Sequence, residues 1–373
     1  MPYIKSKDIL TYARDHKIAH GAFNVNALCQ AKAVIEACEE LRCAAIIQVT
    51  EPGLAFIGGN PDFLHGTIEE KKLGAKRIAT YVKKLAENTF IPVSLHLDHG
   101  RSFETCKICI NAGFNSVMID GSSLPYEENV ALAKKVATFA HKHDVSVEAE
   151  LGVLAGQEDH VFAASSTYTN PMTAVDFLKR TKVDLLAISY GTKHGAVKGD
   201  NVVLRKEIAI ATMENMRHEG VDAVLVSHGS SLVPQYIVNE INALGGQVKG
   251  HGIPIEQLKE VIPCGISKIN MDTDIRLATT RNILEFFEAH PEKRETSKIY
   301  PLLVEKRDSF EYRYYLKDYI DALETNKNIT GELVDIIPLM EKAVKEIVLT
   351  ANVEFGSVGD AYYIYKKTYF VNL

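Results

Sequence analysis

Three histidines stand at or just after the ends of short apolar segments, at widely separated places in the chain. They are His99 in HLDHG, His194 in GTKHGAVKG and His228 in HGSS. Three neutral imidazoles that leave one coordination position open are the ligand set of a catalytic zinc, whereas a structural zinc is closed by four protein ligands. Any one histidine is more often structural or exposed, but three at equivalent positions predict one catalytic zinc centre.

Acidic side chains occupy the same kind of position. Asp98 ends SLHLD, Asp120 follows SVMI, and Glu148 and Glu150 alternate in VSVEAEL. Ionisable groups are costly to bury unless they are paired or bind a metal, so their recurrence at these points indicates a functional site. His96 would share a strand face with Asp98, either as a partner of a metal ligand or as a satisfied core histidine.

Glycines and hydroxyls follow the last two of the three histidines. The stretches concerned carry Gly195, Lys198, Gly229, Ser230, Ser231 and Thr273. Backbone N–H groups in such turns, together with hydroxyls, can form a pocket for a phosphate. Glycine at a turn also has purely conformational reasons, and Lys198 is either part of the pocket or a solvated side chain.

Eight short apolar, β-branched segments alternate with amphipathic stretches of helical length. The apolar segments span residues 20–25, 44–50, 92–98, 116–121, 145–151, 185–191, 223–229 and 266–273. Repeated βα units predict the α/β class, and eight of them predict a closed (β/α)8 TIM barrel. Residues 291–373 predict additional C-terminal helices outside the barrel, and no linker-like stretch divides residues 1–373, so we expect a single domain.

A TIM barrel brings the C-terminal ends of its strands together at one mouth, where active sites are built. The histidines, the carboxylates and the glycine-rich turns all lie at those ends. Asn24 and Thr50 end the first two segments, and Asn270 lies in the eighth. We therefore expect these side chains to surround one cavity.

Composition narrows the class of function. The formal charge of −6 is small and the basic residues are dispersed, which disfavours nucleic-acid binding. The N-terminus lacks the apolar core of a signal peptide and no run of about eighteen apolar residues occurs, so we expect a cytoplasmic protein with no membrane partner. Six cysteines in so long a chain indicate reduced thiols, and the Cys106–Cys109 CxxC motif lacks the second pair that a four-thiolate zinc site requires.

Several motifs together resemble one known family. HLDHG, MIDGSSLPYEENVALAKKVATFAH, VSVEAELG, GTKHGAVKG, HGSS and KINMDTDIRLA are similar to class II, zinc-dependent fructose-bisphosphate aldolases, over roughly residues 4–290. The tail matches only in patches such as EFGSVGDA. The resemblance implies reversible cleavage of fructose 1,6-bisphosphate, a phosphorylated small-molecule sugar, into dihydroxyacetone phosphate and glyceraldehyde 3-phosphate. It also implies a homodimer or homotetramer.

The resemblance assigns roles to the metal ligands and to the groups that move protons. It implies that His99, His194 and His228 hold the catalytic Zn²⁺ and that Asp120 and Glu150 supply a second divalent metal position; it also allows a monovalent cation. It further implies that Asp98 exchanges the proton of the C4 hydroxyl, that Glu158 handles the carbon proton, and that Asn270 hydrogen-bonds the enediolate. These roles agree with the chemistry, because cleavage between C3 and C4 needs a Lewis acid for the enediolate and a positioned carboxylate for the hydroxyl proton.

The same likeness places the substrate. The glycine and hydroxyl turns would receive the C1 phosphate, with Asn24 and Thr50 also lining the substrate site. Asp272 and Arg276, in the DTDxR pattern, favour fructose bisphosphate, because the planar guanidinium suits a second phosphate. The structural alternative is a helix-capping Asp272 and an exposed Arg276.

Four positions depart from the family pattern and leave alternatives open. They are Thr50, Ala155, Lys193 and Val197. The chain could therefore act on another anionic ketose phosphate, such as tagatose or sedoheptulose bisphosphate, or bind a sugar phosphate without catalysis. A Schiff-base aldolase is a further alternative, for which Lys268 is the candidate lysine.

Overall fold

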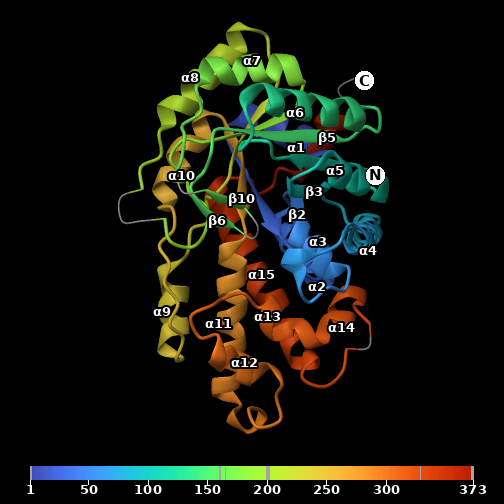
Figure 1. Cartoon of the computed structure of the whole chain (residues 1–373), viewed down its shortest axis with the longest axis vertical. Helices are drawn as coiled ribbons and strands as arrows, with labels where there is room; N and C mark the ends of the chain where they lie inside the picture. The colour runs from blue at the N-terminus through green and yellow to red at the C-terminus, as the bar shows by residue number, and fades with distance from the viewer. Residues whose placement is uncertain (1, 159–160, 164, 199–201, 328, 371–373) are drawn as a thin grey trace.

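Eight parallel strands close into a barrel in the computed structural model of the chain (Figure 1). The strands are β1 (His20–Asn24), β2 (Ala45–Thr50), β3 (Val93–Gly100), β4 (Ser116–Ile119), β5 (Ser146–Leu151), β8 (Leu185–Ile188), β9 (Val224–Ser227) and β10 (Ile266–Met271). Their order around the barrel is β1-β10-β9-β8-β5-β4-β3-β2. Each barrel strand therefore pairs with the barrel strands that come before and after it in the chain, and β10 pairs with β1 to close the barrel. The structure describes residues 2–158, 161–163, 165–198, 202–327 and 329–370. The predicted TIM barrel is confirmed.

Helices follow the strands and cover the barrel (Figure 1). They are α2 (Leu28–Leu41), α3 (Glu51–Ile57), α4 (Ile68–Ala86), α5 (Phe103–Ala112), α6 (Tyr126–His141), α7 (Pro171–Thr181), α8 (Lys206–His218), α9 (Gln235–Ala243), α10 (Ile255–Val261) and α11 (Thr273–Ala289), with short 3-10 turns η1 (Phe63–His65) and η2 (Ile262–Cys264). Local sequence sets several helix starts: the hydroxyl of Ser102 accepts the N–H of Thr105, and the side chain of Asn170, followed by Pro171, caps α7.

The barrel strands are buried on both faces. Residues facing outward pack under the covering helices, while Ala22, Ile46, Leu185 and Val224 belong to a cluster that also contains Ile9 and Leu10 of α1 (Ser6–His16). Helix α1 therefore closes the N-terminal end of the barrel, and the C-terminal end is left for the polar side chains. Burial on both faces explains why the sequences of the strands are almost continuously apolar.

The C-terminal part of the chain is helical, as predicted. Its elements are η3 (Pro291–Lys293), α12 (Ile299–Glu305), α13 (Arg313–Leu316), η4 (Lys317–Tyr319), α14 (Ile320–Thr325), α15 (Leu333–Phe355) and α16 (Ala361–Phe370). Helix α15 packs against α2 and α11, and a separate apolar cluster joins the extension to α2, α3 and η1. In Figure 1 the helices α11 to α15 extend below the barrel. The assignment of residues 1–373 to one domain stays a prediction.

Two smaller expectations concern cysteines and membranes. Cys106 and Cys109 lie in α5 as buried free thiols, as expected for core cysteines. Among the described residues, no helix is both long enough and apolar enough to cross a bilayer.

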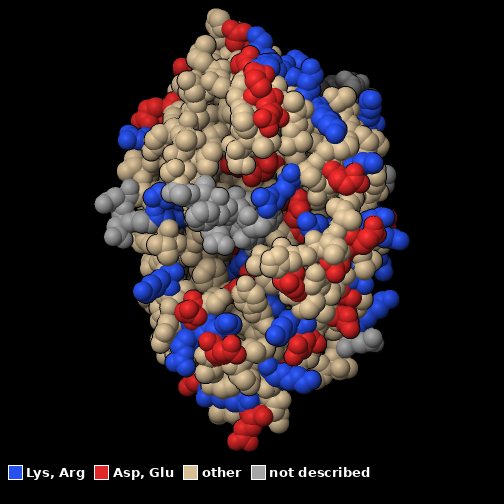
Figure 2. All heavy atoms as spheres, viewed as in Figure 1, with Lys and Arg blue, Asp and Glu red and all other residues tan. Residues whose placement is uncertain are grey.

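Basic and acidic side chains are interspersed on the face of the molecule drawn in Figure 2.

Asp184 stabilises the N-terminal end of the barrel. One carboxylate oxygen accepts hydrogen bonds from the Val147 N–H at 2.8 Å and from His141 Nε2 at 2.9 Å, and Lys7 Nζ lies 3.2 Å from the other oxygen. Burial raises the pKa of Asp184, but these partners outweigh it and leave the pKa below its ordinary value of 3.8. The stabilisation is therefore present above pH 3.8 and is lost as the pH falls through the lower folded pKa.

Asp184→Asn should lower the free energy of unfolding by about 1–3 kcal/mol at neutral pH, because it removes charge-assisted hydrogen bonds. Urea denaturation monitored by circular dichroism would measure this loss. The difference from the wild-type chain should narrow in acid, since the wild-type carboxylate is then protonated. A difference that does not depend on pH would contradict the electrostatic explanation.

Candidate active site

A bulge in β3 aims two neighbouring side chains at the mouth of the barrel. The pairing of β3 with β4 is regular up to Leu97, then shifts by one residue so that Gly100 pairs with Ile119. His99 has φ 48°, in the left-handed region that non-glycine residues rarely adopt. The side chains of neighbouring residues in a regular strand point to opposite faces of the sheet. The bulge changes this, so that the side chains of Asp98 and His99 both point toward the mouth of the barrel.

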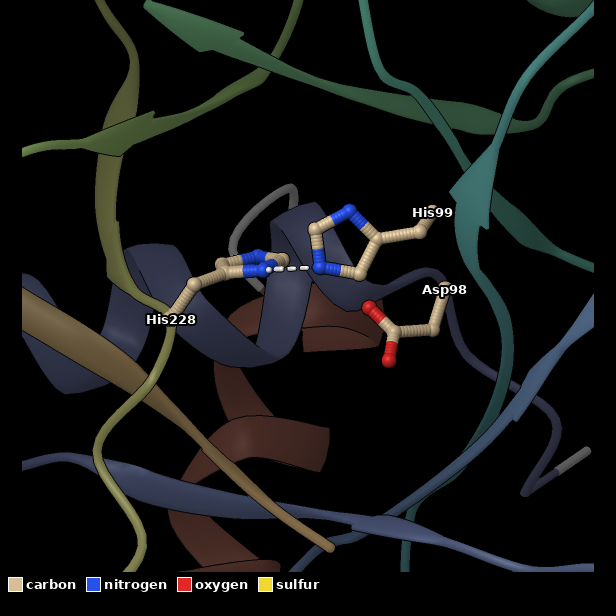
Figure 3. A group of neighbouring side chains, drawn as sticks. All are labelled: Asp98, His99 and His228. Carbon is tan, nitrogen blue, oxygen red and sulfur yellow. Dashed lines mark hydrogen bonds between the residues drawn. The ribbon is translucent and has the colours of Figure 1, made fainter. Parts of the chain in front are cut away.

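His99 and His228 face one another across that site (Figure 3). Nε2 of His99 lies 3.0 Å from Nδ1 of His228. The other ring nitrogen of each is engaged by a carboxylate: His99 Nδ1 lies 3.0 Å from Asp120 Oδ2, and His228 Nε2 lies 2.6 Å from Glu148 Oε1. The 3.0 Å contact is a hydrogen bond, in which one of the two facing nitrogens donates to the other. With both imidazoles neutral and their N–H groups directed at the carboxylates, the two facing nitrogens would present lone pairs to a metal ion. A cation that replaces the shared proton would be bound by both imidazoles.

The ligand atoms around this pair form two overlapping groups in the described part of the chain. Asp98, His99 and His228 form one group, and His99, Asp120 and Glu150 form the other; in each, the atoms lie within 4.8 Å of one another. In Figure 3 the carboxylate of Asp98 points toward the space between the two rings. The donor set of imidazole nitrogens and carboxylate oxygens is one that zinc and other divalent metals accept.

The electrostatics also favour a cation. Glu150 is buried and its Oε2 has no hydrogen-bond partner, while His228 Nδ1 lies 3.9 Å away from that oxygen. Burial and the charge of Asp120 raise the pKa of Glu150 well above its ordinary value. Burial lowers the pKa of His99, but the nearby carboxylates, first that of Asp98, outweigh it and raise the pKa well above its ordinary value. The site therefore has an excess of negative charge that a divalent ion would neutralise.

His194 reaches the same mouth from the loop after β8. Its ring centroid lies 5.2 Å from that of His99 and 6.5 Å from that of His228, while the His99 and His228 centroids are 4.7 Å apart. Imidazoles that share one tetrahedral zinc have centroids about 5 Å apart, given Zn–N bonds of about 2.0–2.1 Å. Only the His194–His228 separation is wider. The rings of the three predicted ligands therefore lie at one mouth, but His194 is in neither of the two groups of close ligand atoms.

Glycine at position 229 brings the loops of His194 and His228 together. Gly229 has φ 59°, and a Cβ there would lie 2.5 Å from the carbonyl oxygen of Lys193. Any side chain would therefore push the turn after β9 away from the loop after β8. Gly229 has a packing reason besides any contact with a ligand.

Asp98 is fixed by side-chain amides. Its Oδ2 accepts hydrogen bonds from Asn24 Nδ2 at 2.9 Å and Gln48 Nε2 at 3.3 Å, and its Oδ1 accepts one from Asn270 Nδ2 at 3.1 Å. Gln48 also donates to Asn24 Oδ1 at 2.6 Å. These neutral donors come from β1, β2 and β10, so three strands orient a carboxylate that lies beside a metal-ligand candidate.

Comparison with known proteins decides the family. Residues 4–360 match the family described as fructose-bisphosphate aldolase class-II.

The chain belongs to the class II fructose-bisphosphate aldolase family.

Relatives and solved structures agree with this membership. The chain is 38% identical over 340 residues to the fructose-bisphosphate aldolase of Treponema pallidum, covering 87% of this chain and 94% of that protein. It is 37% identical over 300 residues to that of Giardia intestinalis, covering 79% and 85%. The crystal structure of the YdjI aldolase from Escherichia coli K12 matches with a TM-score of 0.64 at 25% identity, covering 95% of this chain and 98% of that one. The protein is therefore an aldolase, and class II aldolases are metal-dependent.

The pairing of Lys268 with Glu148 beneath this aldolase site was not predicted from the sequence. Lys268 Nζ donates to Glu148 Oε2 at 3.0 Å and to Asn270 Oδ1 at 2.9 Å, and Glu148 in turn holds His228. Burial raises the pKa of Glu148, but Lys268 and His228 outweigh it and hold the pKa below its ordinary value. The sequence did offer one indication of this role for Glu148. Glu148 and Glu150 are two residues apart in β5, so both side chains face the barrel interior, where Glu148 can contact other site residues. Lys268, the Schiff-base candidate, acts here as the counter-ion of Glu148.

His96 lies beneath the site. Its Nδ1 is 2.7 Å from Ser116 Oγ, and its Nε2 is 3.5 Å from Glu148 Oε2. Burial and the charge of Lys268 lower the pKa of His96 well below its ordinary value. His96 is therefore buried with only Nδ1 hydrogen-bonded, and its Nε2, which has no hydrogen-bond partner, faces Glu148, the residue that contacts the ligand candidate His228.

The predicted substrate residues fall into two sets. Gly195, Asp272, Thr273 and Arg276 line one cavity of about 390 Å³ together with residues of the C-terminal extension. Asp272 does not cap its helix with its side chain, and Arg276 is only 8% exposed, so the structural alternative for this pair is wrong.

The other predicted substrate residues are buried and contact protein groups. The Thr50 hydroxyl accepts the Gly53 N–H at 3.1 Å and so caps α3. Ser230 Oγ lies 2.6 Å from Ser227 Oγ, and Lys198 donates to the carbonyl of Lys193, so Lys198 is not the solvated side chain of the alternative. Ser231 is buried as well.

Glu158 lies on a short antiparallel hairpin. The strand β6 (Gly156–Glu158) pairs antiparallel with β7 (Val161–Ala163). The N–H of His194 donates to the carbonyl of Ala155 at 2.8 Å, which ties the hairpin to the metal-ligand loop. The position of the Glu158 side chain lies outside the described residues.

Proposed function

We propose that this aldolase reversibly cleaves fructose 1,6-bisphosphate to dihydroxyacetone phosphate and glyceraldehyde 3-phosphate. The observation that carries the proposal is the pair of facing imidazole nitrogens, His99 Nε2 and His228 Nδ1, 3.0 Å apart with Asp98 beside them. The relatives named as fructose-bisphosphate aldolases support the choice of substrate.

The donor set supports Zn²⁺ as the catalytic metal. His99 and His228, which lie in one group of close ligand atoms, would hold it together with His194, whose ring lies beside that of His99. Asp120 and Glu150 would supply a second divalent position. When bound, the zinc supplies a Lewis acid that polarises oxygens of the ketose. A monovalent cation, a homodimeric or homotetrameric assembly and a cytoplasmic location stay predictions.

Asp98 is the proposed proton acceptor for the C4 hydroxyl. Breaking the bond between C3 and C4 turns that hydroxyl into the carbonyl of the aldehyde product, so its proton must leave to a positioned base. The amides of Asn24 and Asn270 contact separate oxygens of Asp98 and hold the carboxylate in one orientation. In the reverse direction Asp98 returns the proton.

Asn270 and Glu158 have the remaining chemical roles. The amide of Asn270 lies between Asp98 and His228, where it can donate to an oxygen that becomes negative during cleavage. We assign Glu158 to the proton at the product carbon, because the hairpin that carries it is tied to the loop of His194.

The two ends of the ketose have separate anchors in this proposal. The turns with Gly195, Gly229, Ser230, Ser231 and Thr273 would bind the C1 phosphate, with Asn24, Thr50 and Lys198 supporting them. Asp272 and Arg276 would face the distal end, where the guanidinium suits a second phosphate; they share a cavity with Gly195 and Thr273, so the two anchors adjoin.

Steady-state assays with three ketose bisphosphates test the substrate. We expect kcat/KM for fructose 1,6-bisphosphate to exceed that for tagatose 1,6-bisphosphate by about tenfold or more, because the epimeric C4 hydroxyl is misplaced relative to Asp98. Sedoheptulose bisphosphate should also react more slowly. A preference for either competitor would reassign the substrate, and binding without turnover in zinc-replete protein would indicate a sugar-phosphate binder.

A further inference from the structure

The C-terminal extension forms one wall of the substrate cavity. Ser309, Phe310, Glu311 and Tyr314 line the same space as Gly195 and Arg276. Gly195 adjoins the metal-ligand candidate His194, so this cavity opens beside the proposed reaction centre. The residues that meet the distal end of the substrate therefore come from the extension as well as from the barrel.

Glu311 of this wall binds the arginine that the sequence assigns to the distal phosphate. Arg276 donates to Asp272 through Nε at 2.9 Å and through Nη2 at 2.5 Å, and its Nη1 pairs with Glu311 Oε2. Arg313 also holds Glu311, with Nε 2.8 Å from Oε1 and Nη2 2.7 Å from Oε2. Two guanidinium groups face two carboxylates, so the cluster is electrically balanced.

The wall is fixed in place. Arg313 is fully buried, its guanidinium carbon lies 3.9 Å from the centre of the Phe63 ring, and its Nη1 donates to Asn26 Oδ1 at 3.3 Å. The hydroxyl of the neighbouring Tyr312 accepts a hydrogen bond from Asn26 Nδ2 at 2.9 Å. Glu311 is thus held beside Arg276 by packing from η1 and the loop after β1.

A phosphate at this wall must compete with Glu311. Charge-assisted, multidentate hydrogen bonds are the strong ones, and both Asp272 and Glu311 already make them to Arg276. A dianionic phosphate that approaches Arg276 also approaches two carboxylates, and the repulsion reduces what the guanidinium contributes to binding.

We propose that Glu311 is a specificity-determining residue, which holds Arg276 and weakens the recognition of a phosphate on the distal, aldehyde-derived half of the substrate. The inference rests on the proposed function, because it concerns the partner that condenses with dihydroxyacetone phosphate. It predicts that the site discriminates only modestly between phosphorylated and unphosphorylated aldehydes. Removing the charge of Glu311 should release Arg276 for the phosphate.

The test uses the condensation direction with zinc-replete, full-length protein. Dihydroxyacetone phosphate is kept saturating, and kcat/KM is measured for glyceraldehyde 3-phosphate and for glyceraldehyde. Glu311→Gln should raise the ratio of the two values about tenfold, because a guanidinium freed from a carboxylate gains a charge-assisted contact. The ratio compares two aldehydes on the same variant, so it is independent of the fraction of active protein, and circular dichroism reports that the variant is folded.

Two further variants make the result decisive. Glu305→Gln, at an exposed glutamate of α12 that lies 3.7 Å from Lys306, is the matched control and should leave the ratio unchanged. Glu311→Asp shortens the side chain while keeping its charge, and should move the ratio in the same direction by a smaller factor. An unchanged or lowered ratio, in whichever of the Glu311 variants still condenses glyceraldehyde, would overturn the inference. Failure of the wild-type protein to condense either aldehyde would instead overturn the proposed function.

Discussion

Asp98→Ala should lower kcat for the cleavage of fructose 1,6-bisphosphate about 1,000-fold, the usual scale for the loss of a positioned general base. The reason is that Asp98 is the carboxylate that lies beside both facing imidazoles and is oriented by amides from three strands. Zinc should remain bound, because His99 and His228 keep the carboxylates that fix their ring orientation. KM should change much less than kcat, since the base acts in the transition state.

Two measurements and a control variant support this test. Coupled-enzyme assays give kcat and KM, and atomic absorption gives the zinc content of the variant. Asp144→Asn, at an exposed carboxylate that pairs with Lys5 at the other end of the barrel, is the control and should leave activity unchanged. Cleavage at a near-normal rate by a zinc-loaded Asp98 variant would remove Asp98 from its role.

Metal removal should have an effect of similar size. A strong chelator should reduce cleavage by more than about 1,000-fold, because the Lewis acid contributes several kcal/mol to transition-state stabilisation. Added zinc should restore activity. Borohydride in the presence of dihydroxyacetone phosphate should have no effect, because Lys268 is paired with Glu148 and the family is metal-dependent.

The ligands can be tested one at a time. His228→Ala should lose both zinc and activity, whereas His218→Ala, at an exposed histidine of α8, should lose neither. His194→Ala addresses the ligand with the widest ring separation and should also lower the zinc affinity. Activity that survives chelation but is destroyed by borohydride would point to a Schiff base and exclude the metal mechanism.

Much of this architecture could be predicted from local sequence. The strands were found because parallel strands buried on both faces are short, apolar and β-branched, and each expected segment overlaps one strand of the barrel. His99, His194 and His228 were found because polar residues at strand ends are rare in a core and the barrel gathers those ends at one mouth. These inferences need only periodicity, composition and one rule of topology.

The details of the site required the tertiary structure. The expected third strand stopped at Asp98, whereas β3 continues to Gly100 through a bulge that turns His99 into the site. The bulge depends on the pairing with β4, which the sequence of one strand does not specify. Similarly, Glu158 is part of a hairpin that the sequence analysis did not predict, because β6 pairs with β7.

By itself, the sequence determined that eight βα units carry candidate metal ligands at one end of a barrel. Only the tertiary structure decided which side chains hold those ligands, as Glu148 does for His228, and which carboxylate competes for Arg276. Glu311 lies in a separate helical segment, far along the chain, and meets Arg276 only because the extension packs against η1 and the loop after β1. Strand periodicity is a local property of the backbone, whereas such pairings are set by how distant elements pack.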